Sequence, residues 1–277
     1  MCRLYGLRAN EPTKVECTLV YAQNALMAQS QADLRGVSHP DGWGIGFYEG
    51  PRATIERRDT AAHEDLHFSV TAERVYAETV VAHVRRATVG SNSQANTHPF
   101  CYRNWTFAHN GTVTAFERIR TTLEQQTEED LLDQRRGTTD SELVFYWLLS
   151  RMSAAGLDPN GTGARLELLV EVLREAVAYL DDLNDRAGAE NPAKLNFLLT
   201  DGSILVATRF RHSLYWLVRE GIHDCEICGI PHVHHQPGVD YRAVVLASEP
   251  ITHESWHEVP EGGVLAVDHT VHAEVYP

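Results

Sequence analysis

The pattern of apolar and polar positions along the chain predicts many short β-strands. Nine apolar segments are bounded by turn residues and are expected to be strands: residues 2–9, 42–50, 79–87, 105–111, 195–202, 204–210, 214–220, 242–248 and 263–268. Several of them are apolar at nearly every position, which is typical of strands that are covered on both faces. The pattern therefore indicates buried sheets.

Three longer stretches, residues 17–34, 140–156 and 164–183, have the periodicity of helices. In the third, five apolar residues share the three-and-four spacing of one buried helix face: Leu166, Leu169, Val170, Leu173 and Val177. That spacing is the signature of an amphipathic helix packed on a core. Many strands combined with a few such helices favour stacked sheets under helical cover.

The composition is that of a globular protein, with 43 % hydrophobic and 22 % charged residues among 277. This length is sufficient for a large buried core. No repeat and no long low-complexity linker divides the chain, so we expect a single domain over residues 1–277. The segments 156–163 and 221–240 are the positions at which a domain boundary would first be sought.

The charge balance restricts the partners. With 38 acidic and 24 basic side chains the formal net charge is −14, which disfavours nucleic acids and anionic membranes. A small molecule or a protein is the expected partner. The chain has no apolar run of the roughly 18 residues that a membrane span needs, and its polar start does not resemble a secretion signal. Five cysteines, an odd and small number, favour a reducing cytoplasm.

Cys2, directly behind the initiator methionine, is the first candidate catalytic residue. It can be a small apolar residue at the start of an edge strand. Alternatively, removal of Met1 would place a free α-amine and a thiol on the same residue. An α-amine titrates near pH 8, so part of it is neutral at pH 7 and can accept the thiol proton.

Further candidates lie in the segment 82–113, where a buried strand ends in two arginines, Arg85 and Arg86. Two like charges there must find partners. Asn110 and Gly111 form either a hairpin turn or an oxyanion hole in which the Asn carboxamide and the Gly backbone N–H face a developing negative charge.

Asp140 opens the second predicted helix. A helix N-cap is the default role for such a residue. A carboxylate at this position could instead bind a substrate ammonium group.

Cys2, "AHVRRAT", "THPF", "AHNG" and "TDSE", in this order, resemble the class II glutamine amidotransferases, which are N-terminal nucleophile hydrolases. "HPDGWGIGFYEG" and "VVLASEPIT" are similar to a stand-alone branch that includes γ-glutamyl hydrolases of ergothioneine assembly, glutathione breakdown and γ-glutamylanilide processing. The resemblance covers essentially the whole chain. It implies an α+β fold, a four-layer αββα sandwich.

Carried over residue by residue, the resemblance makes Cys2 the nucleophile and its freed amine the base. Asn110 and Gly111 form the oxyanion hole. Arg85 binds the α-carboxylate of a glutamine-like substrate and Asp140 binds its α-ammonium, an arrangement in which a bidentate arginine contact supplies the orientation.

Thr88 and His98 match pocket positions of the family less closely, and His98 can equally be an ordinary hydrogen-bonded histidine. Arg86 stands where synthase relatives commonly have Trp. This departure leaves the chemistry intact but counts against the ammonia-channelling pocket of the synthases.

The resemblance implies hydrolysis of a γ-glutamyl amide through a Cys2 thioester, releasing glutamate and ammonia or an amine. No cofactor is needed for this catalysis. One alternative is a glutaminase subunit that supplies ammonia to a separate synthase or ligase partner. Another is a catalytically silent regulatory or binding protein.

The segment 223–235, "HDCEICGIPHVHH", is a separate signal. Cys225 and Cys228 have metal-ligand spacing, and His232 and His234 complete a candidate structural zinc site. The alternatives are an exposed histidine-rich loop with two reduced thiols, a redox pair, and a zinc-dependent hydrolase. The last lacks a nearby acidic general base.

Overall fold

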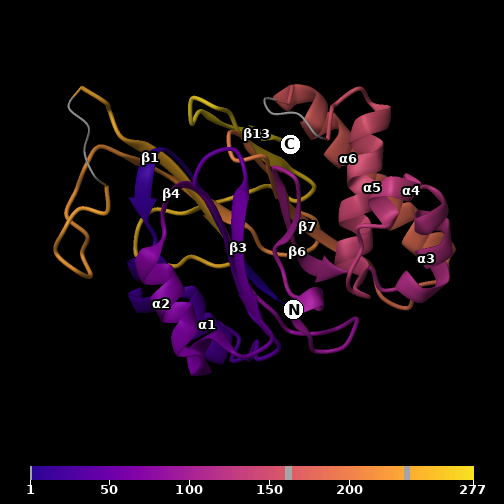
Figure 1. Cartoon of the computed structure of the whole chain (residues 1–277), viewed down its shortest axis with the longest axis horizontal. Coiled ribbons are helices and arrows are strands. Elements are labelled where there is room, and N and C mark those ends of the chain that lie inside the picture. Colours follow the sequence, from indigo (N-terminus) through magenta and orange to yellow (C-terminus); the bar gives the residue numbers. More distant parts are fainter. Residues whose placement is uncertain (1, 160–163, 234–237) are drawn as a thin grey trace.

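The computed structural model describes residues 2–159, 164–233 and 238–277. In this structure two antiparallel β-sheets are stacked face to face, and helices cover the outer face of each sheet (Figure 1). The fold is therefore the α+β, four-layer αββα sandwich that the resemblance implies.

The first sheet contains seven strands: β1 (Arg3–Lys14), β2 (Trp43–Tyr48), β3 (Ala53–Arg58), β4 (Tyr76–Val84), β9 (Tyr215–Glu220), β10 (Arg242–Ala247) and β11 (His257–Glu258). Their order is β11-β9-β10-β1-β4-β2-β3. The second sheet contains six strands: β5 (Phe100–Tyr102), β6 (Trp105–Thr112), β7 (Lys194–Thr200), β8 (Leu205–Thr208), β12 (Val264–Val267) and β13 (Ala273–Tyr276). Their order is β13-β12-β8-β7-β6-β5.

All nine predicted strands are confirmed. The four strands that the pattern did not predict, β3, β5, β11 and β13, are the outermost strands of the two sheets. An edge strand has a neighbour on one side only and is less completely covered, so its residues need not be apolar. The strand β11 has two residues, both exposed, and no pattern can identify it.

Two helices, α1 (Leu26–Gln31) and α2 (Leu66–Arg74), lie on the first sheet. The second sheet is covered by a group of four: α3 (Phe116–Gln125), α4 (Glu129–Leu132), α5 (Asp140–Ala154) and α6 (Leu166–Arg186). The described residues also form three short helical turns, η1 (Cys17–Tyr21), η2 (Ala62–Glu64) and η3 (Gln94–Asn96). Figure 1 shows the two helical groups on opposite sides of the sheets.

The helices predicted at 140–156 and 164–183 are confirmed as α5 and α6, whereas the continuous helix predicted over 17–34 is wrong. That stretch forms the π-helical turn η1 and then α1, separated by a non-helical break. At the break, Asn24 donates a backbone hydrogen bond to Ile251 O and a side-chain hydrogen bond to Pro250 O. These contacts dock the break onto the segment that follows β10.

The strand register brings separate motifs to one end of the sandwich. Arg3 in β1 pairs with Val84 in β4, so Cys2 comes level with Arg85. On its other side β1 pairs with β10, and Tyr5 lies opposite Ala247. A core of apolar side chains from both sheets holds β6 against β1 and β4. In the described ranges, none of the helices combines the length and the apolar character that a membrane span requires.

Candidate active site

Cys2 lies immediately before β1 and is 7 % exposed. Its sulfur accepts a hydrogen bond from the backbone N–H of Arg86 at 3.3 Å, and its thiol lies 3.5 Å from the carbonyl oxygen of Arg86. Burial raises the pKa of the Cys2 thiol. The thiol is therefore predominantly neutral at pH 7, and a base is needed to form the nucleophilic thiolate.

Arg3 fixes the backbone of Cys2. Its guanidinium is fully buried, donates to the Cys2 carbonyl oxygen at 2.9 Å and forms ion pairs with Asp33 and Glu249. Burial opposes ionisation of Asp33, but the hydrogen bond from Val37 N–H and the charge of Arg3 lower the pKa of Asp33 to about 2. The two carboxylates compensate the buried cation, which holds the first residue of the site in place. The sequence signal that could have identified this role of Arg3 is the presence of a charged residue inside an apolar strand.

Arg85 is 2 % exposed and follows directly after β4. Its guanidinium donates only to uncharged oxygen atoms: the carbonyls of Asp41, Val89 and Ser91, and the side chain of Asn92. Within the described ranges no carboxylate forms an ion pair with it. A buried cation without a counter-ion is unfavourable, so this group is suited to binding an anionic ligand.

The neighbouring residue Arg86 is exposed, so the two adjacent arginines have different environments. Burial lowers the pKa of Arg85, whereas Asp41 and Asp140 act in the opposite direction. The charges of Arg85 and Asp140 also act on the pKa of Cys2. The thiol, the buried guanidinium and the Asp140 carboxylate are therefore within electrostatic reach of one another.

Asp140 is the first residue of α5, but it is not the N-cap. Thr139 is the N-cap, and its hydroxyl accepts a hydrogen bond from Glu142 N–H. One oxygen of Asp140 accepts from Val113 N–H at 2.8 Å, and the other accepts from Ser141 N–H at 2.8 Å. The carboxylate therefore connects the start of α5 to the end of β6, which carries Asn110 and Gly111.

Asn110 is fully buried in β6, and its carboxamide nitrogen donates to Ser248 Oγ at 2.8 Å, while its carboxamide oxygen has no partner in the described structure. Ser248 Oγ also accepts from Leu4 N–H at 3.0 Å. If the amide turns by half a turn, the serine hydroxyl can donate to the amide oxygen. Both N–H groups of Asn110 would then be available to an oxyanion.

Gly111 lies inside β6 and pairs with Leu195 in β7. The hairpin interpretation of Asn110-Gly111 is therefore wrong, because the strand continues through both residues to Thr112. A Cβ atom on Gly111 would lie 1.8 Å from the carbonyl oxygen of Lys194. Only glycine allows this close approach of two backbones.

Thr88 and His98 have different environments. Thr88 is exposed, and its hydroxyl lies 3.0 Å from that of Thr112. His98 is 4 % exposed and packs between the rings of His83 and Phe100. Burial lowers the pKa of His98 well below its usual range, so the imidazole is neutral. The roles of Thr88 and His98 as substrate contacts stay predictions.

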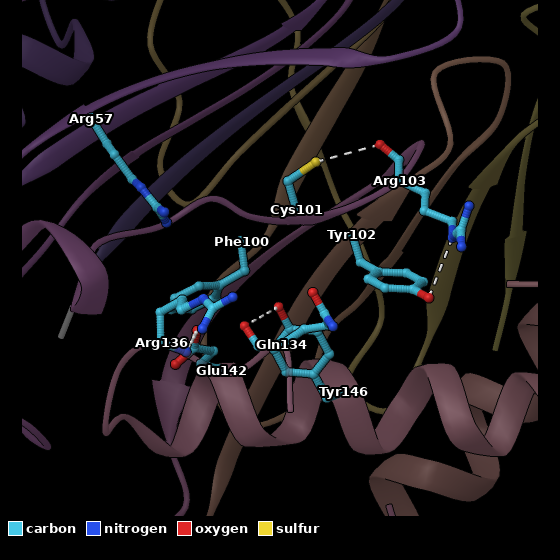
Figure 2. A pocket seen from close by; sticks show the side chains of 9 residues that line it. All are labelled: Arg57, Phe100, Cys101, Tyr102, Arg103, Gln134, Arg136, Glu142 and Tyr146. Atoms are coloured by element: carbon cyan, nitrogen blue, oxygen red, sulfur yellow. Dashed lines mark hydrogen bonds between the residues drawn. The ribbon is translucent and has the colours of Figure 1, made fainter. Parts of the chain in front are cut away.

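A cavity of about 450 Å³ lies between β5 and the start of α5. Figure 2 shows the side chains that line it. Its lining includes three arginines, Arg57, Arg103 and Arg136, and one carboxylate, Glu142. This excess of positive charge favours anions. None of the residues assigned to catalysis from the sequence lines it.

The candidate metal ligands lie elsewhere in the fold. Cys225, Cys228 and His232 gather around Cys17, a residue that the sequence analysis did not assign to any site. His234 lies outside the described residues. A ligand contributed by a segment so distant in the chain has no local sequence signal.

The chain is similar in sequence to known proteins over nearly its whole length. The family described as glutamine amidotransferases class-II matches residues 1–275. A Saccharomyces cerevisiae protein named "probable glutamine amidotransferase" is 29 % identical, with 96 % of this chain and 82 % of that protein covered. A Mycobacterium tuberculosis protein named gamma-glutamyl-hercynylcysteine sulfoxide hydrolase is 28 % identical, with 96 % and 93 % covered.

Solved structures show the same fold. A glutamine aminotransferase class-II domain protein from Silicibacter pomeroyi superposes with a TM-score of 0.64 at 22 % identity, over 99 % of this chain and 98 % of that one. The glutamine phosphoribosylpyrophosphate amidotransferase of Bacillus subtilis has a TM-score of 0.60 at 16 % identity, and 48 % of that longer chain is covered.

Proposed function

The chain belongs to the class-II glutamine amidotransferases and is an amidohydrolase of this family, and from this premise we propose that it hydrolyses a γ-glutamyl amide through a thioester on Cys2. The observation that carries the proposal is the environment of Arg85. Its guanidinium is buried, has no carboxylate partner in the described ranges and lies level with Cys2 across β1 and β4. The names of the two relatives above support this substrate class.

In the proposed complex the two charges of the substrate's α-carbon orient the γ-amide. The α-carboxylate takes the place of the missing counter-ion of Arg85, and the α-ammonium binds Asp140. Both groups are held by neighbouring backbone atoms before the substrate arrives. Such preorganisation lowers the entropic barrier, because the reacting carbon is presented to the sulfur in one orientation.

The reaction proceeds in two balanced steps. The free amine of Cys2 takes the thiol proton, the sulfur attacks the γ-carbonyl carbon, and the oxyanion is stabilised by Asn110 and Gly111. Collapse of this intermediate breaks the C–N bond, and the leaving amine takes the proton from the α-ammonium of Cys2. The Cys2 amine then takes a proton from a water molecule, the water oxygen attacks the thioester carbon, and the C–S bond breaks. Glutamate leaves, and the sulfur regains its proton from the α-ammonium of Cys2.

Arg85→Lys is expected to raise KM for γ-glutamyl amides by roughly 10- to 100-fold, because a point charge replaces the bidentate fork. Asp140→Asn is expected to raise KM similarly through the α-ammonium. Steady-state release of glutamate measures both effects. The matched control is Arg86→Lys at the exposed neighbouring arginine, which should leave KM unchanged. Wild-type kinetics in either site variant would exclude that residue from the substrate clamp.

Ser248→Ala is expected to lower kcat about tenfold with little change in KM, because the Asn110 amide loses the hydroxyl that orients it. Asn110→Ala should itself lower kcat by about 10²- to 10³-fold. A double-mutant cycle separates orientation from a general structural effect. The loss from Ser248→Ala should disappear in the Asn110→Ala background, and full additivity would contradict the positioning role.

A further inference from the structure

Three cysteines and one histidine meet at the far end of β1 from Cys2. The ligand atoms of Cys17, Cys225, Cys228 and His232 all lie within 4.8 Å of one another. The strand β1 separates this cluster from the candidate active site. Its 12 residues correspond to about 40 Å of extended chain. In Figure 1 the part of the connection between β9 and β10 that is drawn in orange extends away from the N-terminus.

We propose that Cys17, Cys225, Cys228 and His232 bind one Zn²⁺ ion, which fastens the connection between β9 and β10 to the turn that follows β1. The set contains three thiols and one imidazole, which is a donor combination of closed, structural zinc sites. All four tetrahedral positions are occupied by protein atoms. The site therefore has no open position for water or substrate, and its role is structural rather than catalytic.

The distances agree with this assignment. In a tetrahedral site with Zn–S bonds of about 2.3 Å, neighbouring sulfur atoms are separated by about 3.8 Å. Cys228 Sγ and His232 Nε2 are already 3.3 Å apart. The other ligand pairs, which lie within 4.8 Å, need to approach by only about 1 Å. Side-chain rotation is sufficient for such a change.

The local backbone favours thiolates. The backbone N–H of Ile227 donates to Cys225 Sγ at 3.4 Å, and Gly229, directly after Cys228, has a φ of +72°. Gly229 N–H also donates to Cys225 O at 2.8 Å, closing a tight turn around the two sulfur atoms. A hydrogen bond from a backbone N–H stabilises a charged sulfur, and glycine accommodates the positive φ without strain.

Cys17 takes the fourth ligand position, which the sequence motif assigned to His234. It is 3 % exposed in the π-helical turn η1, and such π turns frequently occur at functional sites. The backbone around His232 is attached to the end of β1, close to Cys17. The carbonyl oxygen of His232 accepts from Lys14 N–H at 2.8 Å, and Val233 forms a β-bridge with Thr13.

Within the described part of the connection, residues 221–231 bury few apolar side chains, so a cross-link is needed to hold this segment in place. Most of its residues from 221 to 231 are exposed, including two large apolar side chains, Ile227 at 43 % and Ile230 at 55 %. A short segment that cannot bury its apolar residues is commonly stabilised by a metal or a disulfide. A disulfide would join two of the three thiols and would leave the third thiol and the imidazole unexplained.

The test is the metal content of the full-length protein purified with a reducing agent and without a histidine tag. About one zinc per chain is expected in the wild type. Cys228→Ser alters an exposed ligand and Cys17→Ser a buried one, and both should lose zinc. Cys101→Ser, at a half-buried cysteine outside the cluster, and Cys2→Ala should each keep it. Substitution of Co²⁺ should give the visible absorption of a tetrahedral thiolate site, and this absorption should be lost in Cys228→Ser.

His234→Ala separates this proposal from the ligand set that the sequence motif indicated. Retention of zinc in His234→Ala together with its loss in Cys17→Ser supports Cys17 as the fourth ligand. The opposite pair of results overturns that assignment. Wild-type protein that remains metal-free after titration with Zn²⁺, or that contains a Cys225–Cys228 disulfide under these conditions, overturns the site. These results do not depend on the proposed hydrolase activity, because they are measured on metal content.

Discussion

Cys2→Ala is expected to abolish hydrolysis of γ-glutamyl amides, and Cys2→Ser to lower kcat by several orders of magnitude. Alanine removes the nucleophile. Serine keeps the shape of the side chain, but its hydroxyl is a far weaker nucleophile than a thiol. Because the residue is small and the strand β1 is held by two neighbouring strands, both variants should fold. Release of glutamate measures the loss, and circular dichroism with thermal unfolding checks the fold.

The matched control for the sulfur is Cys101→Ser, at a half-buried cysteine outside the metal cluster, which leaves Cys2 in place. A glutamine analogue that carries an electrophile should add one mass label to the N-terminal peptide and to no other cysteine. Substantial turnover by folded Cys2→Ala protein would contradict the proposed mechanism. Labelling of a different cysteine would transfer the role of nucleophile to that residue.

Retention of Met1 is expected to lower kcat by about 10²- to 10⁴-fold, the range usually supplied by a general base. The sulfur remains in this form of the protein, but the α-amine of Cys2 becomes a non-basic amide. An unperturbed thiol is only a few per cent ionised at pH 7, and burial raises the pKa of the Cys2 thiol further. In the described structure no imidazole forms a hydrogen bond with its sulfur, which contacts the backbone of Arg86.

The experiment uses one polypeptide in two states. An N-terminal extension is placed before Cys2 so that a site-specific protease can cut directly in front of the cysteine. Activity should be very low in the fused form and should appear in proportion to cleavage, as followed by intact mass. In a Cys2→Ala fusion, cleavage should restore nothing. Full activity in protein that retains Met1 would refute the amine as the base, even though the chain belongs to the family.

The central strands could be predicted because they are covered on both faces. A strand such as 79–87 or 242–248 is apolar at most positions because both of its faces are covered. This pattern can be recognised in the strand's own sequence. The four edge strands carry no such requirement, and their identity depends on the neighbour that each one meets. The break between η1 and α1 likewise depends on contacts of Asn24 with a segment more than 200 positions away.

The sequence by itself determined the family and the candidate chemistry. Cys2, Arg85, Asn110, Gly111 and Asp140 lie in short ordered motifs, and each residue type suits one chemical task. Their assembly is a matter of strand register, which places Cys2 level with Arg85 and connects Asp140 to the end of β6.

Only the tertiary structure decided which polar residues support those motifs. Arg3 orients the nucleophile through its backbone, Ser248 contacts the Asn110 amide, and Cys17 joins the candidate zinc ligands. Arg3 is in turn held by Glu249, so each of these three residues depends on a contact between segments that are far apart in the chain. The physical reason is that a local pattern reports the burial and conformation of its own residues, whereas a contact between distant segments exists only after the sheets have formed.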